Sequence, residues 1–299
     1  MSAGRARLLV LGAGGQIGGE VMARAAAAGL TAQAPERPYD IADAKATEAI
    51  MAAARPAAVI NAAAFTAVDR AEHEPERAFA VNAQGAAHVA AACARYGAAL
   101  LHLSTDYVFG EAATPRHEDD PIAPLNVYGA SKAAGELAVR AILARHLIVR
   151  TSGVFGPRGR NFVGAILAAA AQGRPLRVVE DEVTCPTPAG QVAEVVLRMA
   201  RRLAENGEAP WGTYHYCAKG PVSWFAFARA ALDDYTRLTG RQPSLTAVTA
   251  AAYGAAARRP NHAVLDCTRI GRVWNIAQRS WRDDLAATVA AIAGEQEGR

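Results

Sequence analysis

A glycine-rich turn near the N-terminus restricts the possible folds of this chain more than any other feature. It follows the apolar run Leu8–Leu11 and reads Gly-Ala-Gly-Gly-Gln-Ile-Gly over residues 12–18, after which a helical pattern continues to about residue 28. The glycines at 12, 15 and 18 allow a tight turn, close approach of backbone N–H groups to a pyrophosphate, and close packing of helix on strand. Strand, glycine turn and helix in this order predict a dinucleotide-binding fold.

Apolar runs and helical patterns then alternate with short connections. Expected strands cover residues 30–34, 57–61, 99–103 and 147–150, and expected helices cover 43–54, 74–96 and 127–145. This alternation is typical of a Rossmann-like, doubly wound parallel sheet in the α/β class. We therefore expect an NAD(P)-binding Rossmann domain over residues 1–150. Residues 151–299 should form a smaller substrate-binding lobe, with some segments returning to the sheet.

Three residues suited to proton transfer follow this pattern. Thr105 lies at the end of the 99–103 strand, while Tyr128 and Lys132 stand four residues apart at the start of the next helix. Four residues is close to one helical turn, so the phenol and the ammonium share a face. A neighbouring cation lowers the pKa of a phenol. The Thr105 hydroxyl can form a hydrogen bond with the carbonyl oxygen that the phenol would protonate. The arrangement suits protonation of an oxygen that gains negative charge.

The region after the second strand bears on the choice of cofactor. No acid stands at the strand end to bind an adenosine ribose, and Arg37 lies nearby, which favours NADPH while leaving NADH open. Asp40 and Ile41 are either an adenine contact or, for Asp40, a helix-cap or turn residue. The alanines at 62, 63 and 64 leave room for a flat cofactor close to the backbone.

Composition and charge exclude several functions. The arginines are scattered and the net charge is only +4, which disfavours nucleic-acid binding. The four cysteines are far apart in sequence and show no metal-binding spacing, so we expect no metal site and buried thiols in a reducing compartment. Because no run is long enough for a membrane helix or a signal peptide, we expect a cytoplasmic protein without a membrane partner.

With these residues laid out, the chain resembles the dTDP-4-dehydrorhamnose reductases of the extended short-chain dehydrogenase/reductase superfamily. The resemblance covers nearly the whole chain. It rests on the glycine turn and on four further motifs: Asn-Ala-Ala-Ala-Phe-Thr-Ala-Val-Asp at 61–69, Ser-Thr-Asp-Tyr-Val-Phe at 104–109, Pro-Leu-Asn-Val-Tyr-Gly-Ala-Ser-Lys at 124–132 and Arg-Pro-Asn at 259–261.

The resemblance implies reduction of the C4 ketone of a nucleotide-linked deoxyhexulose. The nicotinamide would give hydride to carbon and Tyr128 the proton to oxygen, while Lys132 would lower the Tyr128 pKa and hold the nicotinamide ribose. Thr105 would bind the reacting oxygen. The further matches are Gln16, Ile17, Asp40, Ile41, Ala62, Ala63 and Thr66 at the cofactor and Asp106 at the substrate.

Three departures from the family pattern matter. Many members have a tryptophan near the sugar where this chain has Gly153. A wider pocket is therefore expected, which leaves open a sugar other than 4-dehydrorhamnose. The family's ribose acid has no counterpart at Ala34. Glu20 matches one glutamate of a magnesium site at a dimer interface, but the match near residues 190–191 fails, so a homodimer stays open and no metal is expected.

Two alternatives remain open at the level of sequence. Nucleotide-sugar epimerases share the fold, the turn and the Tyr/Lys pair, whereas dehydratases need a glutamate where this chain has Tyr107. A non-catalytic, NADP-binding regulatory subunit is the other alternative. The natural sugar and its nucleotide carrier are not fixed by these residues.

Overall fold

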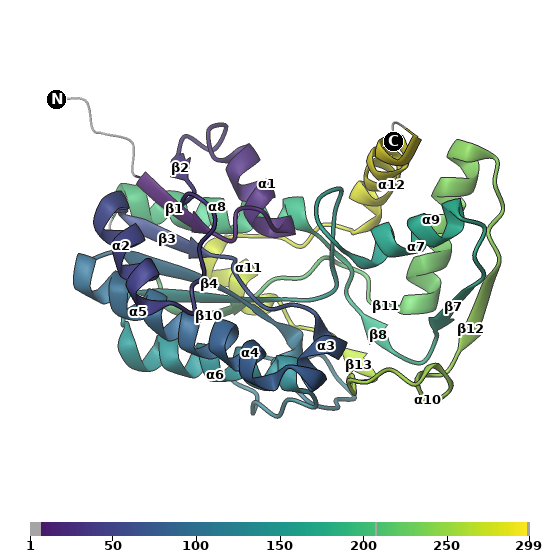
Figure 1. The fold of residues 1–299 in the computed structure, drawn as a ribbon, viewed down its shortest axis with the longest axis horizontal. Coiled ribbons are helices and arrows are strands. Elements are labelled where there is room, and N and C mark those ends of the chain that lie inside the picture. The colour runs from purple at the N-terminus through teal and green to yellow at the C-terminus, as the bar shows by residue number, and fades with distance from the viewer. Residues whose placement is uncertain (1–6, 207, 298–299) are drawn as a thin grey trace.

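A six-stranded parallel sheet forms the centre of the larger part of the molecule (Figure 1). The computed structural model describes residues 7–206 and 208–297. The strands are β1 (Arg7–Leu11), β2 (Thr31–Gln33), β3 (Ala58–Asn61), β4 (Ala99–Thr105), β5 (His146–Thr151) and β10 (Gly212–His215). Their spatial order is β10-β5-β4-β3-β1-β2. Every neighbouring pair is parallel, which confirms the predicted Rossmann-like class.

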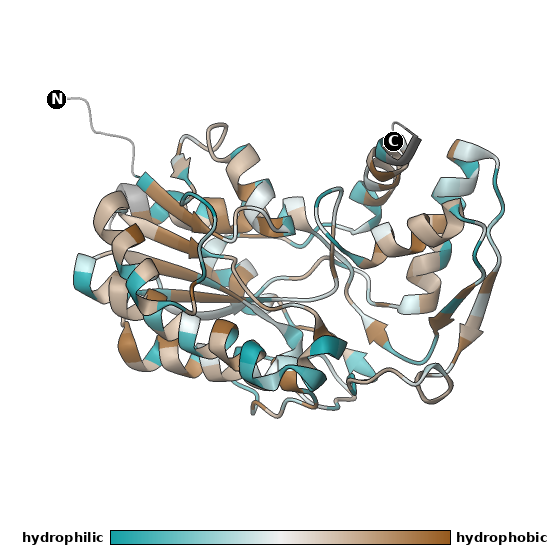
Figure 2. Ribbon diagram, in the orientation of Figure 1, coloured by the Kyte–Doolittle hydropathy of each residue, from teal (hydrophilic) through white to brown (hydrophobic). Residues whose placement is uncertain are grey.

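Helices cover both faces of this sheet. They are α1 (Gln16–Arg24), α2 (Ala44–Ala54), α3 (Val68–His73), α4 (Pro75–Phe79), the π-helix η1 (Ala80–Gln84), α5 (Gly85–Tyr96), the 3-10 turn η2 (Asp106–Val108), α6 (Val127–Ile142), α8 (Ala189–Asn206) and α11 (Thr268–Trp274). Alternate strand residues feed two cores, so Leu8 and Val10 pack with the α8 side while Leu9 and Leu11 pack with the α2 and α5 side. Because helices cover both faces of the sheet, its strands are apolar along nearly their whole length, as Figure 2 shows.

The lobe has a third core of its own. Its elements are β6 (Val154–Phe155), α7 (Phe162–Ala171), β7 (Leu176–Val179), β8 (Val183–Thr184), β9 (Thr187–Pro188), β11 (Val222–Ser223), α9 (Trp224–Thr239), β12 (Leu245–Val248), α10 (Ala250–Tyr253), β13 (His262–Ala263) and α12 (Arg282–Glu297). Phe155 and Phe227 meet edge to face at 5.1 Å in this core, and Trp281 joins them. The lobe is therefore a packed body and not a loose extension.

Two later segments complete the sheet. α8 packs along α1, and β10 then adds a strand beside β5. α11 follows the lobe segments and contacts β10. None of the described helices has the length and hydrophobicity that crossing a membrane requires.

Candidate active site

A cavity of about 1200 Å³ lies where the carboxyl ends of β1, β3 and β4 face the lobe. Parallel sheets bind ligands at this edge. Of the predicted site residues, the following line it: Gly15, Gln16, Ile17, Ala62, Thr66, Thr105, Asp106, Tyr128, Lys132 and Gly153. Gly12, Gly18, Asp40, Ile41 and Ala63 are not part of the lining. The structure thus brings the proton-transfer residues and the helix side of the glycine turn to one cavity.

The glycine turn ends at an open helix terminus. Gly15 is the N-cap residue of α1 and offers no side chain to its first N–H groups, and the Oε1 atom of Gln16 is buried without a partner. Gly12 has φ +80°, and a Cβ there would lie 2.5 Å from the Ala63 nitrogen. Gly12 therefore lets β1 and the loop after β3 approach, while Gly15 and Gln16 face the cavity. Uncapped N–H groups and an unpaired amide oxygen fit a dinucleotide diphosphate and its neighbouring hydroxyls.

The segment after β2 folds back onto this turn. A Cβ on Gly14 would collide with the guanidinium of Arg37, so that cation lies directly against the turn. The Gly12 N–H donates to the Tyr39 hydroxyl at 2.6 Å. Arg37 was singled out in the sequence, but Tyr39 was missed because no local sequence signal marks a tyrosine that folds back onto the turn.

Asp40 is a turn residue in this structure. It accepts from the Ala42 N–H at 2.9 Å and pairs with Arg77 at 2.5 Å. Burial raises its pKa, but these two partners outweigh burial and lower the pKa below its usual value. Ile41 is buried and lies against Gly85. Of the two roles left open for Asp40, the structure thus supports the turn, and the adenine contact stays a prediction.

Tyr128 is placed by a well-formed helix start. Asn126 caps α6 by accepting the Gly129 N–H at 2.7 Å, which fixes the first turn that carries Tyr128. The ring meets Tyr107 edge to face at 6.0 Å. Burial and the charge of Asp106 raise the Tyr128 pKa above its usual value, and the Thr105 hydroxyl lowers it. The Tyr128 phenol is therefore protonated at neutral pH and is a weaker acid than an ordinary phenol.

The Lys132 ammonium was expected to act on the Tyr128 phenol, but in the structure its partners lie on β4. The Nζ atom donates to the Leu103 carbonyl at 2.7 Å and lies 3.4 Å from His102 Nε2. The ammonium is thus directed at the backbone of β4, and Lys132 is not among the groups that shift the Tyr128 pKa. Burial lowers the pKa of Lys132 itself to about 8. His102, which sequence reasoning missed, is neutral because burial lowers its pKa far below its usual value.

Asp106 is held by two hydroxyls. Thr105 donates to Oδ1 at 2.8 Å and Ser152 donates to Oδ2 at 2.7 Å. Burial raises the Asp106 pKa to about 6, although both hydroxyls lower it. Ser152 was not predicted, because its partner lies 46 residues away in the sequence. The carboxyl group is thus already engaged by protein hydroxyls before any substrate arrives.

The part of the cavity that Gly153 lines also holds aromatic residues of the lobe. Gly153 has φ +52°, and a Cβ there would lie 2.9 Å from Thr184 Oγ1, so a larger residue is strained at this backbone position. Phe162 and Trp224 pack at 4.7 Å and also line the cavity. Sequence reasoning missed both aromatic residues because they lie in the loosely patterned second half.

Asn82 joins two cavity-forming elements from inside η1. Its amide accepts the Phe65 N–H at 2.8 Å and donates to the Phe65 carbonyl at 3.0 Å and to Ser131 Oγ at 2.9 Å. These bonds hold the loop after β3 against α6. The predicted continuous helix over residues 74–96 is interrupted at this point by the π-helix.

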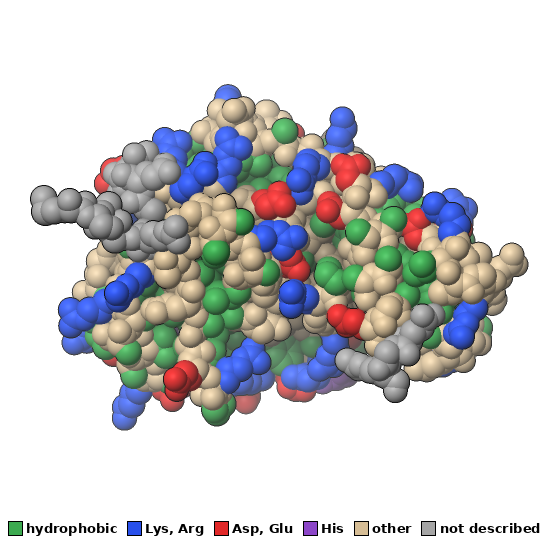
Figure 3. All heavy atoms as spheres, turned by 90° about the horizontal axis from the view of Figure 1, so that it is seen from above, with side chains coloured by type: hydrophobic (Ala, Val, Ile, Leu, Met, Phe, Trp, Pro, Cys, Tyr) green, Lys and Arg blue, Asp and Glu red, His purple; other side chains and the backbone are tan. Residues whose placement is uncertain are grey.

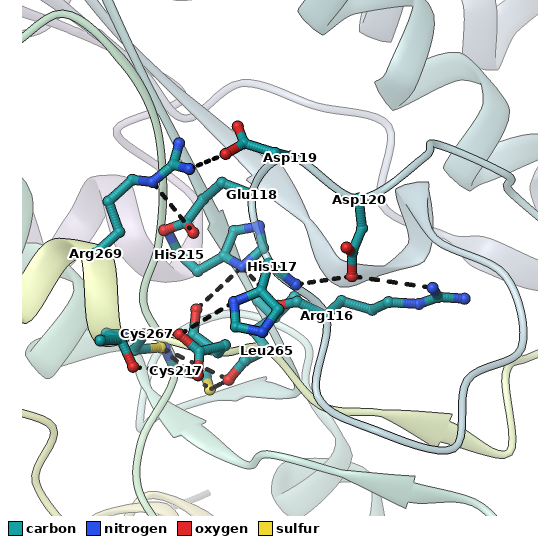
Figure 4. Close-up of polar contacts among 12 residues, drawn as sticks. Arg116, His117, Glu118, Asp119, Asp120, His215, Cys217, Leu265, Cys267 and Arg269 are labelled. Carbon is teal, nitrogen blue, oxygen red and sulfur yellow. Dashed lines mark hydrogen bonds and ion pairs between the residues drawn. The ribbon is translucent and has the colours of Figure 1, made fainter.

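A second polar cluster supports the sheet outside the cavity (Figure 4). Glu118 accepts the His215 N–H at 3.1 Å and pairs with Arg269 at 3.5 Å. Burial and the charge of Arg150 lower the His215 pKa to about 3, so this imidazole is neutral. Cys217 and Cys267 lie nearby with their sulfurs 3.7 Å apart. The cluster fastens the loop at residues 116–120 to β10 and α11 and is structural.

On the face shown in Figure 3, Lys and Arg side chains are dispersed among acidic ones and do not form one patch. Within the described ranges, no group of three or more His, Cys, Asp or Glu residues is placed to hold a metal ion.

Comparisons with known proteins identify the family. The model of the RmlD substrate binding domain matches residues 6–293. A dTDP-4-dehydrorhamnose reductase of Aggregatibacter actinomycetemcomitans is 37% identical over 287 residues, 94% of this chain and 97% of the relative. The chain belongs to the dTDP-4-dehydrorhamnose reductase family.

Solved structures of the dTDP-4-dehydrorhamnose reductase family show the same architecture. The Clostridium acetobutylicum reductase superposes with a TM-score of 0.86 at 32% identity, covering 96% of this chain and 99% of its own. The Bacillus anthracis reductase, solved in complex with NADP, gives a TM-score of 0.85 at 31% identity, with coverages of 96% and 99%. The resemblance inferred from the sequence is thereby confirmed at the level of family and fold.

Proposed function

We propose that this chain uses NADPH to reduce the C4 ketone of a nucleotide-linked deoxyhexulose, converting dTDP-4-dehydrorhamnose to dTDP-L-rhamnose. The observation that carries the proposal is the meeting of Thr105, Tyr128 and the open N-terminus of α1 in one cavity. Membership of the reductase family and the NADP named in the Bacillus anthracis structure support the choice of substrate and cofactor.

Each residue has a definite task in this reaction. Bound NADPH supplies the hydride that reaches the ketone carbon. Tyr128, which is protonated at neutral pH, donates its proton to the ketone oxygen as the negative charge develops there. Thr105 donates a hydrogen bond to the same oxygen when its hydrogen is not given to Asp106, and Lys132 holds a ribose hydroxyl near the end of β4. Gln16 and the N–H groups after Gly15 hold the cofactor diphosphate.

NADPH is the proposed cofactor because of Arg37. Its guanidinium lies against Gly14, and the end of β2 offers no carboxylate to a ribose 2′-hydroxyl. A cation at this place stabilises a 2′-phosphate. Arg37→Ala is expected to weaken NADPH binding at least ten-fold while leaving NADH binding nearly unchanged, as measured by cofactor fluorescence. Equal weakening of both cofactors would show that Arg37 supports the turn instead.

The decisive experiment follows nicotinamide absorbance with purified protein, NADPH and dTDP-4-dehydrorhamnose. Tyr128→Phe should lower kcat at least 100-fold, because general acid catalysis contributes roughly 10²–10⁴, while the Kd of NADPH stays the same. Cofactor binding with no oxidation across several 4-keto nucleotide sugars would favour the regulatory-subunit alternative. Conversion of a hexose to its C4 epimer without net cofactor oxidation would favour the epimerase.

Two further expectations belong to this proposal. A cytoplasmic location is supported by the four cysteines, all of which are buried free thiols. A homodimer stays a prediction, which light scattering at micromolar concentration will test.

A further inference from the structure

The hydrogen bonds around Asp106 determine which acceptor receives the single hydrogen of the Thr105 hydroxyl. A hydroxyl has one hydrogen and two lone pairs. In the structure Thr105 gives its hydrogen to Asp106 Oδ1 at 2.8 Å and accepts the Tyr107 N–H at 3.2 Å. While Asp106 is ionised, Thr105 therefore has no hydrogen left for a ketone oxygen in the cavity.

A neutral Asp106 reverses this situation. The acid hydrogen on Oδ1 would then be donated to the second lone pair of Thr105, and the Thr105 hydrogen would turn toward the cavity. This arrangement requires the proton of Asp106 to reside on Oδ1 and not on Oδ2.

Ser152 meets that requirement. Its hydroxyl accepts the Cys185 N–H at 3.4 Å, lies 3.1 Å from Thr184 Oγ1, and donates to Asp106 Oδ2 at 2.7 Å. The Ala263 carbonyl, at 3.3 Å, is the longer of its two acceptor contacts. Because Oδ2 already accepts the Ser152 hydrogen, the proton of a neutral Asp106 goes to Oδ1. Ser152 is 1% exposed, so water does not replace it.

We propose that Ser152 is a positioning residue of the reduction: acting through Asp106, it sets the direction in which Thr105 presents its hydrogen to the reacting oxygen. The proposal rests on the proposed reductase function and extends it to a residue that only the folded chain brings to the site. Ser152 also contacts Thr184 of β8 at 3.1 Å. It therefore links Asp106, which follows β4, to the lobe.

The titratable groups around Asp106 allow a pH test. They are Tyr107 on its own turn and Tyr128 on α6, while Glu182 and Arg259 of the lobe act on Tyr107. Burial raises the Asp106 pKa to about 6, and among the interactions that lower this pKa the hydrogen bond from Ser152 is the strongest. Loss of the Ser152 hydroxyl must therefore raise the Asp106 pKa further.

The experiment measures kcat and KM for the NADPH-dependent reduction from pH 5 to pH 9. Activity should fall as pH rises through the Asp106 pKa, because the ionised carboxylate draws the Thr105 hydrogen away from the cavity. Ser152→Ala should lower the plateau kcat about five-fold, the equivalent of one hydrogen bond. It should also move the descending limb of the pH profile about one pH unit higher without changing the KM of NADPH. Ser152→Thr should restore both values.

A double-mutant cycle separates positioning from general damage. Asp106→Asn mimics the neutral acid, since its amide donates to Thr105 and its oxygen accepts from Ser152, and it should abolish the descending limb. Ser152→Ala should then have no further effect on the pH profile. The matched control is Thr187→Val, which removes a buried hydroxyl that bonds only to main-chain groups. A limb that moves equally in Thr187→Val, or that persists in Asp106→Asn, overturns the proposal.

A measurement without substrate distinguishes this proposal from the reductase assignment. The Asp106 carboxyl can be titrated by carbon NMR in the wild type and in Ser152→Ala. A raised pKa in the variant together with no turnover of any 4-keto nucleotide sugar would reject the reductase function alone. An unchanged pKa would reject the role of Ser152.

Discussion

Asp106 is an acid whose ionisation acts against folding. Its side chain is 4% exposed, and burial raises its folded-state pKa to about 6, above the unfolded value near ~3.9. The folded chain therefore binds more protons between these two values. The stability that this group contributes is complete below pH ~4 and is lost as pH rises through 6.

Asp106→Asn should consequently stabilise the protein at neutral pH. Because the folded-state pKa lies about two pH units above the unfolded value, the gain at pH 7.5 should exceed the gain at pH 4.5 by about 2 kcal/mol. Urea unfolding of wild type and variant at the two pH values measures the difference. Asp233→Asn, at an exposed carboxylate of α9, is the matched control and should show no such pH dependence. A gain that is equal at both pH values would contradict the assigned pKa.

At the scale of elements, the helices and strands whose positions depend on a local sequence pattern were predicted. The strand and glycine turn at the N-terminus and the start of α6 at Val127 lie where the sequence pattern predicts them. α2 covers nearly the predicted range of 43–54, and its cap is Asp43 and not Asp40. The π-helix η1 was not predicted, because no local pattern marks it; Asn82 within it bonds to partners 17 and 49 residues away. Ser152 and Tyr39 were missed for the same reason: a long-range contact leaves no periodic signal in the chain.

The contact between η1 and α6 gives a test at this scale. Gly135 of α6 lies so close to η1 that a Cβ would collide with the Asn82 carbonyl. Gly135→Ala should therefore destabilise by about 1–3 kcal/mol, the usual cost of overpacking, although alanine is the better helix former. Gly294→Ala in α12 has open space around its Cβ and should stabilise by up to about 1 kcal/mol. Thermal unfolding of both variants checks the pair, and a stable Gly135→Ala protein would refute the packing argument.

At the scale of the whole molecule, the cavity joins the sheet to the lobe. Its lining includes Gly15 and Tyr128 from one side and Trp224 from the other. A ligand that binds only the folded form adds about 2.7 kcal/mol at one hundred times its Kd. NADPH at that excess should raise the free energy of unfolding by this amount in a urea titration. At the same NADPH concentration Arg37→Ala, with its affinity lowered ten-fold, should keep only about 1.4 kcal/mol of this stabilisation. An unchanged curve in the wild type would argue against cofactor binding.

The position of β10 has a consequence for how this protein can be divided. β10 lies at the sheet edge beside β5, yet its residues follow α7 and α8 in the chain. A polypeptide ending at residue 150 would leave the Leu147–Arg150 backbone without its neighbouring strand and α1 without its covering helix. Exposed strand edges promote association between chains. Residues 1–150 are thus not expected to fold alone, and a ribosome must pass residue 215 before the β5 edge of the sheet can be covered.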